Sequence, residues 1–101
     1  MDSDRERILQ LLSDQQIRLR AWGVRRLGLF GSAARGQVGP GSDMDFVVDF
    51  EPGKKTFDNY MGLKDFLEKL FARRVDLVTS EGLKPQLRDR ILSETIYAPG
   101  L

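Results

Sequence analysis

Residues 29–50 constrain the fold of this chain more than any other segment. They read LFGSAARGQVGPGSDMDFVVDF, with Gly31 and Ser32 after one apolar run and Asp43 and Asp45 entering the next. A glycine-serine turn at the end of a strand frees backbone N–H groups that can hold phosphate oxygens. Two aspartates at positions i and i+2 of a strand share a face and offer hard oxygen ligands to a cation such as Mg²⁺. Together these features predict phosphoryl or nucleotidyl transfer.

The hydrophobic pattern of the chain predicts both strands and helices. Strands are expected where apolar residues alternate, at residues 24–30, 44–50, 75–79 and 95–98. Helices are expected where apolar residues recur at helical spacing, at residues 4–12, 13–22, 32–35, 56–73 and 85–92. Ser13 is the expected N-cap of the second helix, Gly23 is its expected stop, and Pro85 suits the first turn of the last helix.

The apolar faces of three of these helices are expected to face the core. The two N-terminal helices carry Ile8, Leu11, Leu12, Ile17, Leu19 and Trp22. The long helix at residues 56–73 carries Phe57, Tyr60, Met61, Leu63, Phe66, Leu67, Leu70 and Phe71. An aromatic and aliphatic stripe at this spacing is interpreted as core before it is interpreted as a binding surface.

A third aspartate, Asp76, lies in the otherwise apolar segment VDLV. An aspartate at the edge of a surface strand is more often a solvated charge than a metal ligand, so none of the three is informative alone. Aspartate is nevertheless a poor strand former, and like charges on one face repel each other. If the strand of Asp76 lies beside that of Asp45, the carboxylates of Asp43, Asp45 and Asp76 converge, and a bound cation would compensate their charge.

Such a cluster would support nucleotidyl transfer with two Mg²⁺ ions. The ions would activate an attacking hydroxyl and neutralise charge on a leaving pyrophosphate, with attack at the α-phosphorus of a nucleoside triphosphate. Asp43 and Asp45 would bridge both ions. Asp76 would complete the ion that binds the nucleophile and could take its proton. This last role has more weight because the chain contains no histidine.

Gly31 and Ser32 are the expected phosphate-binding residues, and Arg35 is a further candidate. Gly31 would let the backbone approach the β- and γ-phosphates, while Ser32 would add its N–H and hydroxyl groups. A Gly-Ser turn alone is common and usually structural, so its weight comes from the spacing to Asp43. Arg35 is either a contact for the triphosphate or a solvated cation at a helix end, and the sequence favours neither. The GxxxxGK[ST] and GxGxxG motifs are both absent.

Composition argues against several other classes of protein. The 101 residues are expected to form one domain, spanning residues 1–101. Without cysteine or histidine, the chain cannot supply disulfides, thiol nucleophiles, histidine bases or a Ser-His-Asp triad. No apolar run approaches the roughly 20 residues of a membrane span and no signal peptide is evident, so a cytoplasmic location is expected. The net charge of +1, with no aromatics between the basic pairs, gives little reason to expect direct nucleic-acid binding.

With these residues in view, the chain resembles the DNA polymerase β-like nucleotidyltransferase superfamily. The similarity is carried by LFGSAARG…GSDMDFVV, in which a Gly-Ser pair is followed after ten residues by a DxD motif. The size of the chain and the segments RRVDLVT and LKPQLRDRILSETIYA resemble the stand-alone minimal nucleotidyltransferases of that superfamily. The resemblance implies an α+β fold, with a small mixed β-sheet backed by helices. It also implies that Gly31 and Ser32 bind nucleotide phosphates and that Asp43, Asp45 and Asp76 bind Mg²⁺.

The resemblance further suggests a partner. Minimal nucleotidyltransferases of prokaryotes commonly pair with a helical HEPN ribonuclease toxin and act as its antitoxin, and some transfer AMP from ATP to a tyrosine hydroxyl of that toxin. It therefore implies an Mg²⁺- and ATP-dependent protein adenylyltransferase that assembles with a HEPN toxin. Two alternatives stay open: an antitoxin that neutralises its partner by covering it, and a nucleotidyltransferase that acts on a small molecule or an RNA end. The missing acceptor domain of larger relatives weakens the second alternative.

Overall fold

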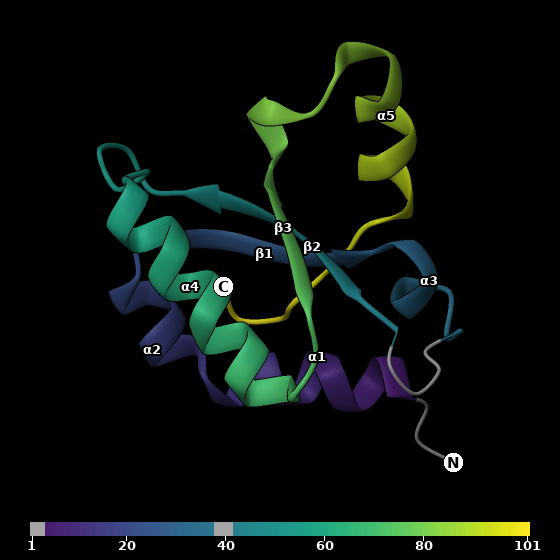
Figure 1. Cartoon of the computed structure of the whole chain (residues 1–101), viewed down its shortest axis with the longest axis horizontal. Coiled ribbons are helices and arrows are strands. Elements are labelled where there is room, and N and C mark those ends of the chain that lie inside the picture. Colours follow the sequence, from purple (N-terminus) through teal and green to yellow (C-terminus); the bar gives the residue numbers. More distant parts are fainter. Residues whose placement is uncertain (1–3, 38–41) are drawn as a thin grey trace.

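A computed structural model describes residues 4–37 and 42–101 and shows a four-stranded sheet with helices packed against it (Figure 1). The strands lie in the order β3-β2-β1-β4 and comprise β1 (Val24–Phe30), β2 (Met44–Phe50), β3 (Val75–Thr79) and β4 (Ile96–Tyr97). The helices are α1 (Asp4–Asp14), α2 (Gln16–Ala21), α3 (Gly31–Ala34), α4 (Phe57–Phe71) and α5 (Pro85–Glu94), with a 3-10 turn η1 (Ser80–Gly82) after β3. The expected α+β fold with a small mixed sheet is confirmed.

Strand β2 pairs with β1 on one side and with β3 on the other. β1 and β2 run antiparallel, and Phe30 at the end of β1 lies opposite Asp45 near the start of β2. β2 and β3 run parallel because α4 carries the chain back between them, and here Asp45 lies opposite Asp76. The sheet therefore brings the end of β1 and the starts of β2 and β3 to one corner of the molecule.

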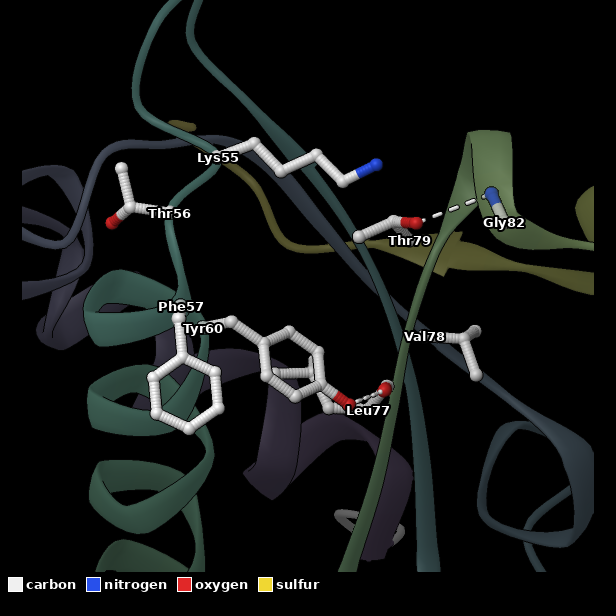
Figure 2. Close-up of a pocket in the computed structure, with 8 residues that line it drawn as sticks. All are labelled: Lys55, Thr56, Phe57, Tyr60, Leu77, Val78, Thr79 and Gly82. Carbon is white, nitrogen blue, oxygen red and sulfur yellow. Dashed lines mark hydrogen bonds between the residues drawn. The ribbon is translucent and has the colours of Figure 1, made fainter.

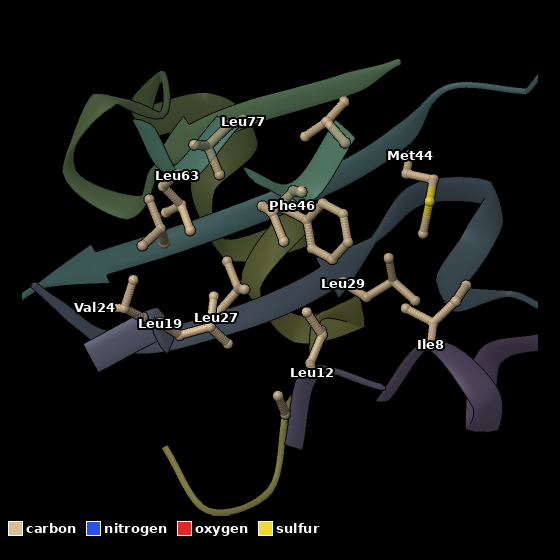
Figure 3. Close-up of a cluster of buried hydrophobic side chains, with 14 of the residues drawn as sticks. Ile8, Leu12, Leu19, Val24, Leu27, Leu29, Met44, Phe46, Leu63 and Leu77 are labelled. Carbon is tan, nitrogen blue, oxygen red and sulfur yellow. The ribbon is translucent and has the colours of Figure 1, made fainter. Parts of the chain in front are cut away.

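Alternate strand residues point into a core that α1, α2 and α4 cover (Figure 3). Phe46 is fully buried there, and its ring stacks on that of Phe71 with the centroids 5.8 Å apart. Other buried members of this core include Leu12, Leu19, Leu27, Leu29, Met44, Val48, Leu63, Leu67 and Leu77. Burying one such side chain contributes about 1.5–3 kcal/mol, so the register that buries this set is strongly favoured. Because side chains alternate across a strand, Asp45 and Asp76 emerge on the opposite face.

Local signals account for several helix ends. The hydroxyl of Thr56 accepts a hydrogen bond from the backbone N–H of Asn59 at 3.1 Å, which caps the start of α4. Gly23 follows α2 with φ 84, the left-handed conformation expected of a helix stop. The expectation for Ser13 is wrong: α1 continues past it, and α2 begins without a side-chain cap. The break between α1 and α2 therefore lies at Gln15, two residues later than the capping pattern predicts.

Four apolar side chains expected in the core are exposed instead. Their exposed fractions are 39% for Leu11, 82% for Ile17, 77% for Phe57 and 42% for Met61. The helical period explains the error in α4, since Met61 precedes the buried Leu63 by two residues and so points to nearly the opposite side. Despite these exposed side chains, no helix within residues 4–37 and 42–101 is both long and apolar enough to cross a membrane.

Candidate active site

Gly31 and Asp45, which belong to the two halves of the sequence motif, lie directly against each other. Gly31 follows β1, and Asp45 is paired with the last residue of that strand. A Cβ atom at Gly31 would overlap the Asp45 carboxylate and would lie 3.2 Å from its Cγ atom. Gly31 also has φ 71, a backbone conformation that other L residues adopt only at an energetic cost. Two independent constraints therefore require glycine here.

The turn that begins at Gly31 continues as the one-turn helix α3. Ala33 and Ala34 are buried in the core and anchor this helix, while Ser32 at its start is partly exposed. Arg5 of α1 donates from its Nη1 atom to the carbonyl oxygen of Ala34 at 3.2 Å, which satisfies an acceptor at the end of α3. The Gly-Ser turn is thus fixed to both the sheet and α1.

The three aspartates lie at one corner of the sheet, but their side chains do not form a preassembled metal cage. Asp45 and Asp76 are paired across β2 and β3, and Asp43 comes one residue before β2. Within residues 4–37 and 42–101, no three acidic, histidine or cysteine side chains are arranged to hold a metal ion. The Asp45 carboxylate is turned toward Gly31, on the β1 side, whereas Asp76 stands on β3. The expected strand adjacency is present, and the close three-carboxylate cluster is not.

Electrostatic repulsion provides a physical reason for this separation. Burial raises the pKa of the Asp45 carboxyl, and the charges of Asp76 and Asp43 raise it further, with a smaller contribution from Glu94; Arg35 acts in the opposite direction. Ionised carboxylates so placed repel each other, and turning apart reduces that repulsion. A set of oxygen donors with this excess of negative charge fits a hard divalent cation such as Mg²⁺.

Glu94, at the end of α5, is a component of the site that the sequence analysis missed. The backbone N–H of Gly31 donates to Glu94 Oε1 at 3.2 Å. Arg35 Nη1 lies 3.5 Å from Glu94 Oε2, and Arg35 Nε donates to Gln37 Oε1 at 3.4 Å. The guanidinium of Arg35 is therefore paired although its side chain is 53% exposed. No spacing in the sequence connects Glu94 to the Gly-Ser turn, because the two meet only when α5 folds beside α3.

A second polar group lies farther along β2, on the face that carries Asp45. Asp49 forms an ion pair with Arg26 of β1 at 2.8 Å and accepts a hydrogen bond from the Ser80 hydroxyl. The guanidinium of Arg26 also lies over the ring of Tyr97 in β4, 4.9 Å from its centroid. These contacts link β1, β2 and β4, and the Ser80 hydroxyl links β2 to η1, which directly follows β3. Arg26 is thus part of the structure of the sheet, although its side chain is 54% exposed.

A cavity of about 420 Å³ lies between the start of α4 and β3, and its lining residues are drawn in Figure 2. It is lined by Lys55, Thr56, Phe57, Tyr60, Leu77, Val78, Thr79 and Gly82. The Tyr60 hydroxyl donates to the backbone carbonyl of Leu77, which satisfies an acceptor of this edge strand. None of the motif residues lines this cavity. A different cavity of about 520 Å³ adjoins the motif and is lined by Ser42, Asp43, Ala72, Arg73 and Arg74.

Comparisons with known proteins agree with this geometry. Residues 14–98 match the family model described as the nucleotidyltransferase domain. The protein adenylyltransferase MntA of Thermococcus cleftensis is 38% identical over 93 residues, which cover 91% of this chain and 93% of that protein. A solved structure assigned as a minimal nucleotidyltransferase is 40% identical, with a TM-score of 0.70 over 91% of this chain and 86% of the other. A chain from a toxin–antitoxin complex with AMP-PNP shares the fold at 22% identity, with a TM-score of 0.69 over 88% of this chain and 73% of that one.

The small mixed sheet, with its Gly-Ser turn packed against an aspartate of the neighbouring strand, and the matches to known proteins identify a nucleotide-transferring enzyme. The family can be assigned because the match to its model covers residues 14–98, most of the chain. The chain belongs to the nucleotidyltransferase domain family. Its fold is that of the minimal nucleotidyltransferases, as the resemblance in sequence implied.

Proposed function

We propose that this nucleotidyltransferase moves AMP from ATP to a hydroxyl group, that of a tyrosine, on a HEPN-type ribonuclease toxin with which it assembles as antitoxin. The name of the 38% identical relative, a protein adenylyltransferase, supports the reaction class. A chain of the same fold has been solved in a toxin–antitoxin complex with AMP-PNP, which supports a toxin partner and an adenine nucleotide. Use of ATP favours a cytoplasmic location for the reaction.

The contact between Gly31 and Asp45 is the observation that carries this proposal. It joins the proposed phosphate-binding turn to a proposed metal-binding carboxylate without any intervening side chain. A triphosphate that lies along the turn would therefore be within reach of a cation held by Asp45, and such proximity of phosphate and metal is what catalysis of nucleotidyl transfer requires.

Each motif residue has a distinct role in the proposal. Gly31 lets the backbone approach the β- and γ-phosphates, Ser32 holds them through its N–H and hydroxyl groups, and Arg35 adds a positive charge to the same phosphates. Asp43, Asp45 and Asp76 would hold two Mg²⁺ ions, which supply electrostatic stabilisation of the transferring phosphate and of the leaving pyrophosphate. The carboxylates would rotate toward one another when the cations offset their repulsion.

The chemical step balances with the residues at hand. The acceptor oxygen forms a bond to the α-phosphorus of ATP while the bond from that phosphorus to the bridging oxygen of the β-phosphate breaks. The acceptor hydroxyl loses its proton to a carboxylate oxygen of Asp76, the proposed general base in a chain without histidine. Pyrophosphate leaves, held by Gly31, Ser32 and Arg35.

The test combines the protein with ATP, Mg²⁺ and the purified product of the neighbouring gene, and measures the intact mass of that partner. The proposal predicts a gain of one or more AMP groups. The double variant Asp43→Ala with Asp45→Ala should abolish the gain while leaving the circular dichroism spectrum unchanged. Asp65→Ala serves as a matched control, since Asp65 is an exposed carboxylate that pairs with Lys69 at 2.9 Å.

Other outcomes would select an alternative. If the double variant still neutralises the partner's toxicity in cells, covering the partner suffices for inhibition and AMP transfer does not. If labelled AMP from ATP appears on RNA ends or on a small molecule but never on the partner, the acceptor class proposed here is wrong.

A further inference from the structure

Glu94 uses both of its carboxylate oxygens on groups that the proposed function assigns to ATP. Its Oε1 accepts the hydrogen bond from Gly31 N–H at 3.2 Å, and its Oε2 lies 3.5 Å from Arg35 Nη1. Its side chain is only 32% exposed. A hydrogen bond that involves an ionised acceptor is stronger than one between neutral groups, and partial burial limits its screening by solvent.

Glu94 and Asp45 hold Gly31 from two sides. The Asp45 carboxylate packs against the Cα atom of Gly31, and the Glu94 carboxylate accepts from its N–H group. Gly31 needs such support, because glycine has more backbone freedom than any other residue and its φ of 71 is one of several accessible values. A turn that is held in one conformation binds a ligand without paying the cost of ordering the backbone.

The backbone that carries Glu94 is itself fixed to β1. The next residues form β4, which pairs with β1 through Gly28 with Tyr97 and Leu29 with Ile96. Gly28 admits this close packing, since a Cβ atom there would lie 3.0 Å from Cδ1 of Tyr97. The main chain around Glu94 and the turn at Gly31 are thus attached to the same strand, and the Glu94 side chain spans the short gap between them.

We propose that Glu94 is a positioning residue, which holds the Gly31 turn and the Arg35 guanidinium in the arrangement that receives the triphosphate of ATP. This inference rests on the proposed function. Arg35 is long and half-exposed, so without Glu94 its guanidinium would keep only the 3.4 Å hydrogen bond to Gln37, would sample more rotamers and would bind phosphate more weakly. Competition would have the opposite effect, because a carboxylate beside the phosphate site repels the ligand. The sign of the change in affinity therefore decides between positioning and competition.

The experiment measures the affinity for AMP-PNP with Mg²⁺ by calorimetry in the unaltered protein and in the variants Glu94→Ala, Glu94→Gln and Glu81→Gln. Positioning predicts that Glu94→Ala weakens binding about tenfold or more. Glu94→Gln should weaken binding less, because its amide oxygen can still accept from Gly31 N–H while the charge facing Arg35 is lost. Glu81→Gln is the matched control, since Glu81 pairs with Lys55 at 3.3 Å, and it should leave the affinity unchanged.

Two further readouts separate positioning from a general loss of structure. The amide proton of Gly31 should shift and exchange faster with solvent in Glu94→Ala, while the amide protons of the buried strands keep their protection. In the AMP-transfer assay, KM for ATP should rise in both Glu94 variants, with kcat within about threefold of the unaltered enzyme. If the alanine variant does not fold, the isosteric glutamine variant provides the same comparison.

The outcomes distinguish this inference from the proposed function. Absence of AMP-PNP binding by the unaltered protein would overturn the proposed function, and the inference with it. Nucleotide binding by the unaltered protein, with equal or tighter binding by folded Glu94→Gln and Glu94→Ala, would overturn only the role given to Glu94. A fall in kcat at unchanged KM would also overturn it, because that pattern indicates action on the chemical step.

Discussion

The Asp45 carboxylate occupies the space that a side chain at Gly31 would need. This relationship links the two sequence motifs more closely than strand pairing alone requires. Any substitution that displaces Asp45 also disturbs the phosphate-binding turn, and any residue larger than glycine in the turn displaces Asp45. The conformations of the two motifs are therefore coupled.

Gly31→Ala should abolish AMP transfer and lower stability. The backbone conformation costs alanine about 1–2 kcal/mol, and the collision with Asp45 adds to that cost. A loss of this size lowers the melting temperature by roughly 4–8 °C per kcal/mol in a domain of this length. Differential scanning calorimetry and the mass assay measure the two effects.

Gly36→Ala is the matched control for the Gly31 prediction. Gly36 has φ 74, yet a Cβ atom there would meet nothing within 4 Å. This variant therefore carries the backbone cost without the collision, and it should keep AMP transfer while losing about 1–2 kcal/mol of stability. Equal loss of transfer in both variants would contradict the importance given to the Asp45 contact.

Asp45→Asn should stabilise the metal-free protein at neutral pH while abolishing AMP transfer. Burial and the neighbouring charges of Asp76 and Asp43 raise the pKa of Asp45, so the folded state penalises its ionised form. That penalty is absent when Asp45 is protonated, and it develops as the pH rises from the ordinary value of 3.8 through the raised pKa. Melting temperatures in EDTA should be a few degrees higher for Asp45→Asn at pH 7, with the difference vanishing in acid.

Much of the fold could be predicted from local patterns, and the errors have identifiable causes. The bounds of the strands at residues 24–30, 44–50 and 75–79 match the predictions. The signals that define them, alternating apolar residues and flanking turn residues, are local to each segment. The exposure of Phe57 and Ile17 was not predictable in this way, since it depends on which side of a helix the sheet covers. Apolar residues at helical spacing indicate that a helix is amphipathic, but they do not show how much of the apolar face the sheet covers.

The site was predictable where it depends on strand pairing and not where it depends on side-chain contacts. The resemblance to the minimal nucleotidyltransferases implied adjacent strands for Asp45 and Asp76, and the structure has these two residues paired in register. The contact of the Asp45 carboxylate with the backbone at Gly31 is a side-chain contact, which no spacing in the sequence reveals. Glu94 meets Gly31 across 63 residues of sequence, through packing of α5 beside α3 that only the folded chain defines.

Mg²⁺ should raise the melting temperature of the unaltered protein, and this increase should depend on Asp43 and Asp45. Binding to the folded state alone stabilises by RT ln(1 + [L]/Kd), about 1.4 kcal/mol at a concentration tenfold above Kd. MgCl2 and NaCl at equal ionic strength separate specific binding from screening. The increase should disappear in Asp43→Ala with Asp45→Ala and persist in Asp65→Ala. An equal increase in both variants would show that Mg²⁺ acts elsewhere.

Gly62→Ala should destabilise the protein, although the same change in the middle of an exposed helix usually stabilises by about 1 kcal/mol. Gly62 lies within α4, where a Cβ atom would sit 2.7 Å from Cη2 and 2.8 Å from Cε3 of Trp22. The indole would have to move, at a typical cost of about 1–3 kcal/mol for overpacking. In a Trp22→Ala background the collision is absent, so Gly62→Ala should there become neutral or stabilising. Urea denaturation of the four proteins gives this coupling, and independent, additive effects would show that Trp22 does not determine the requirement for glycine.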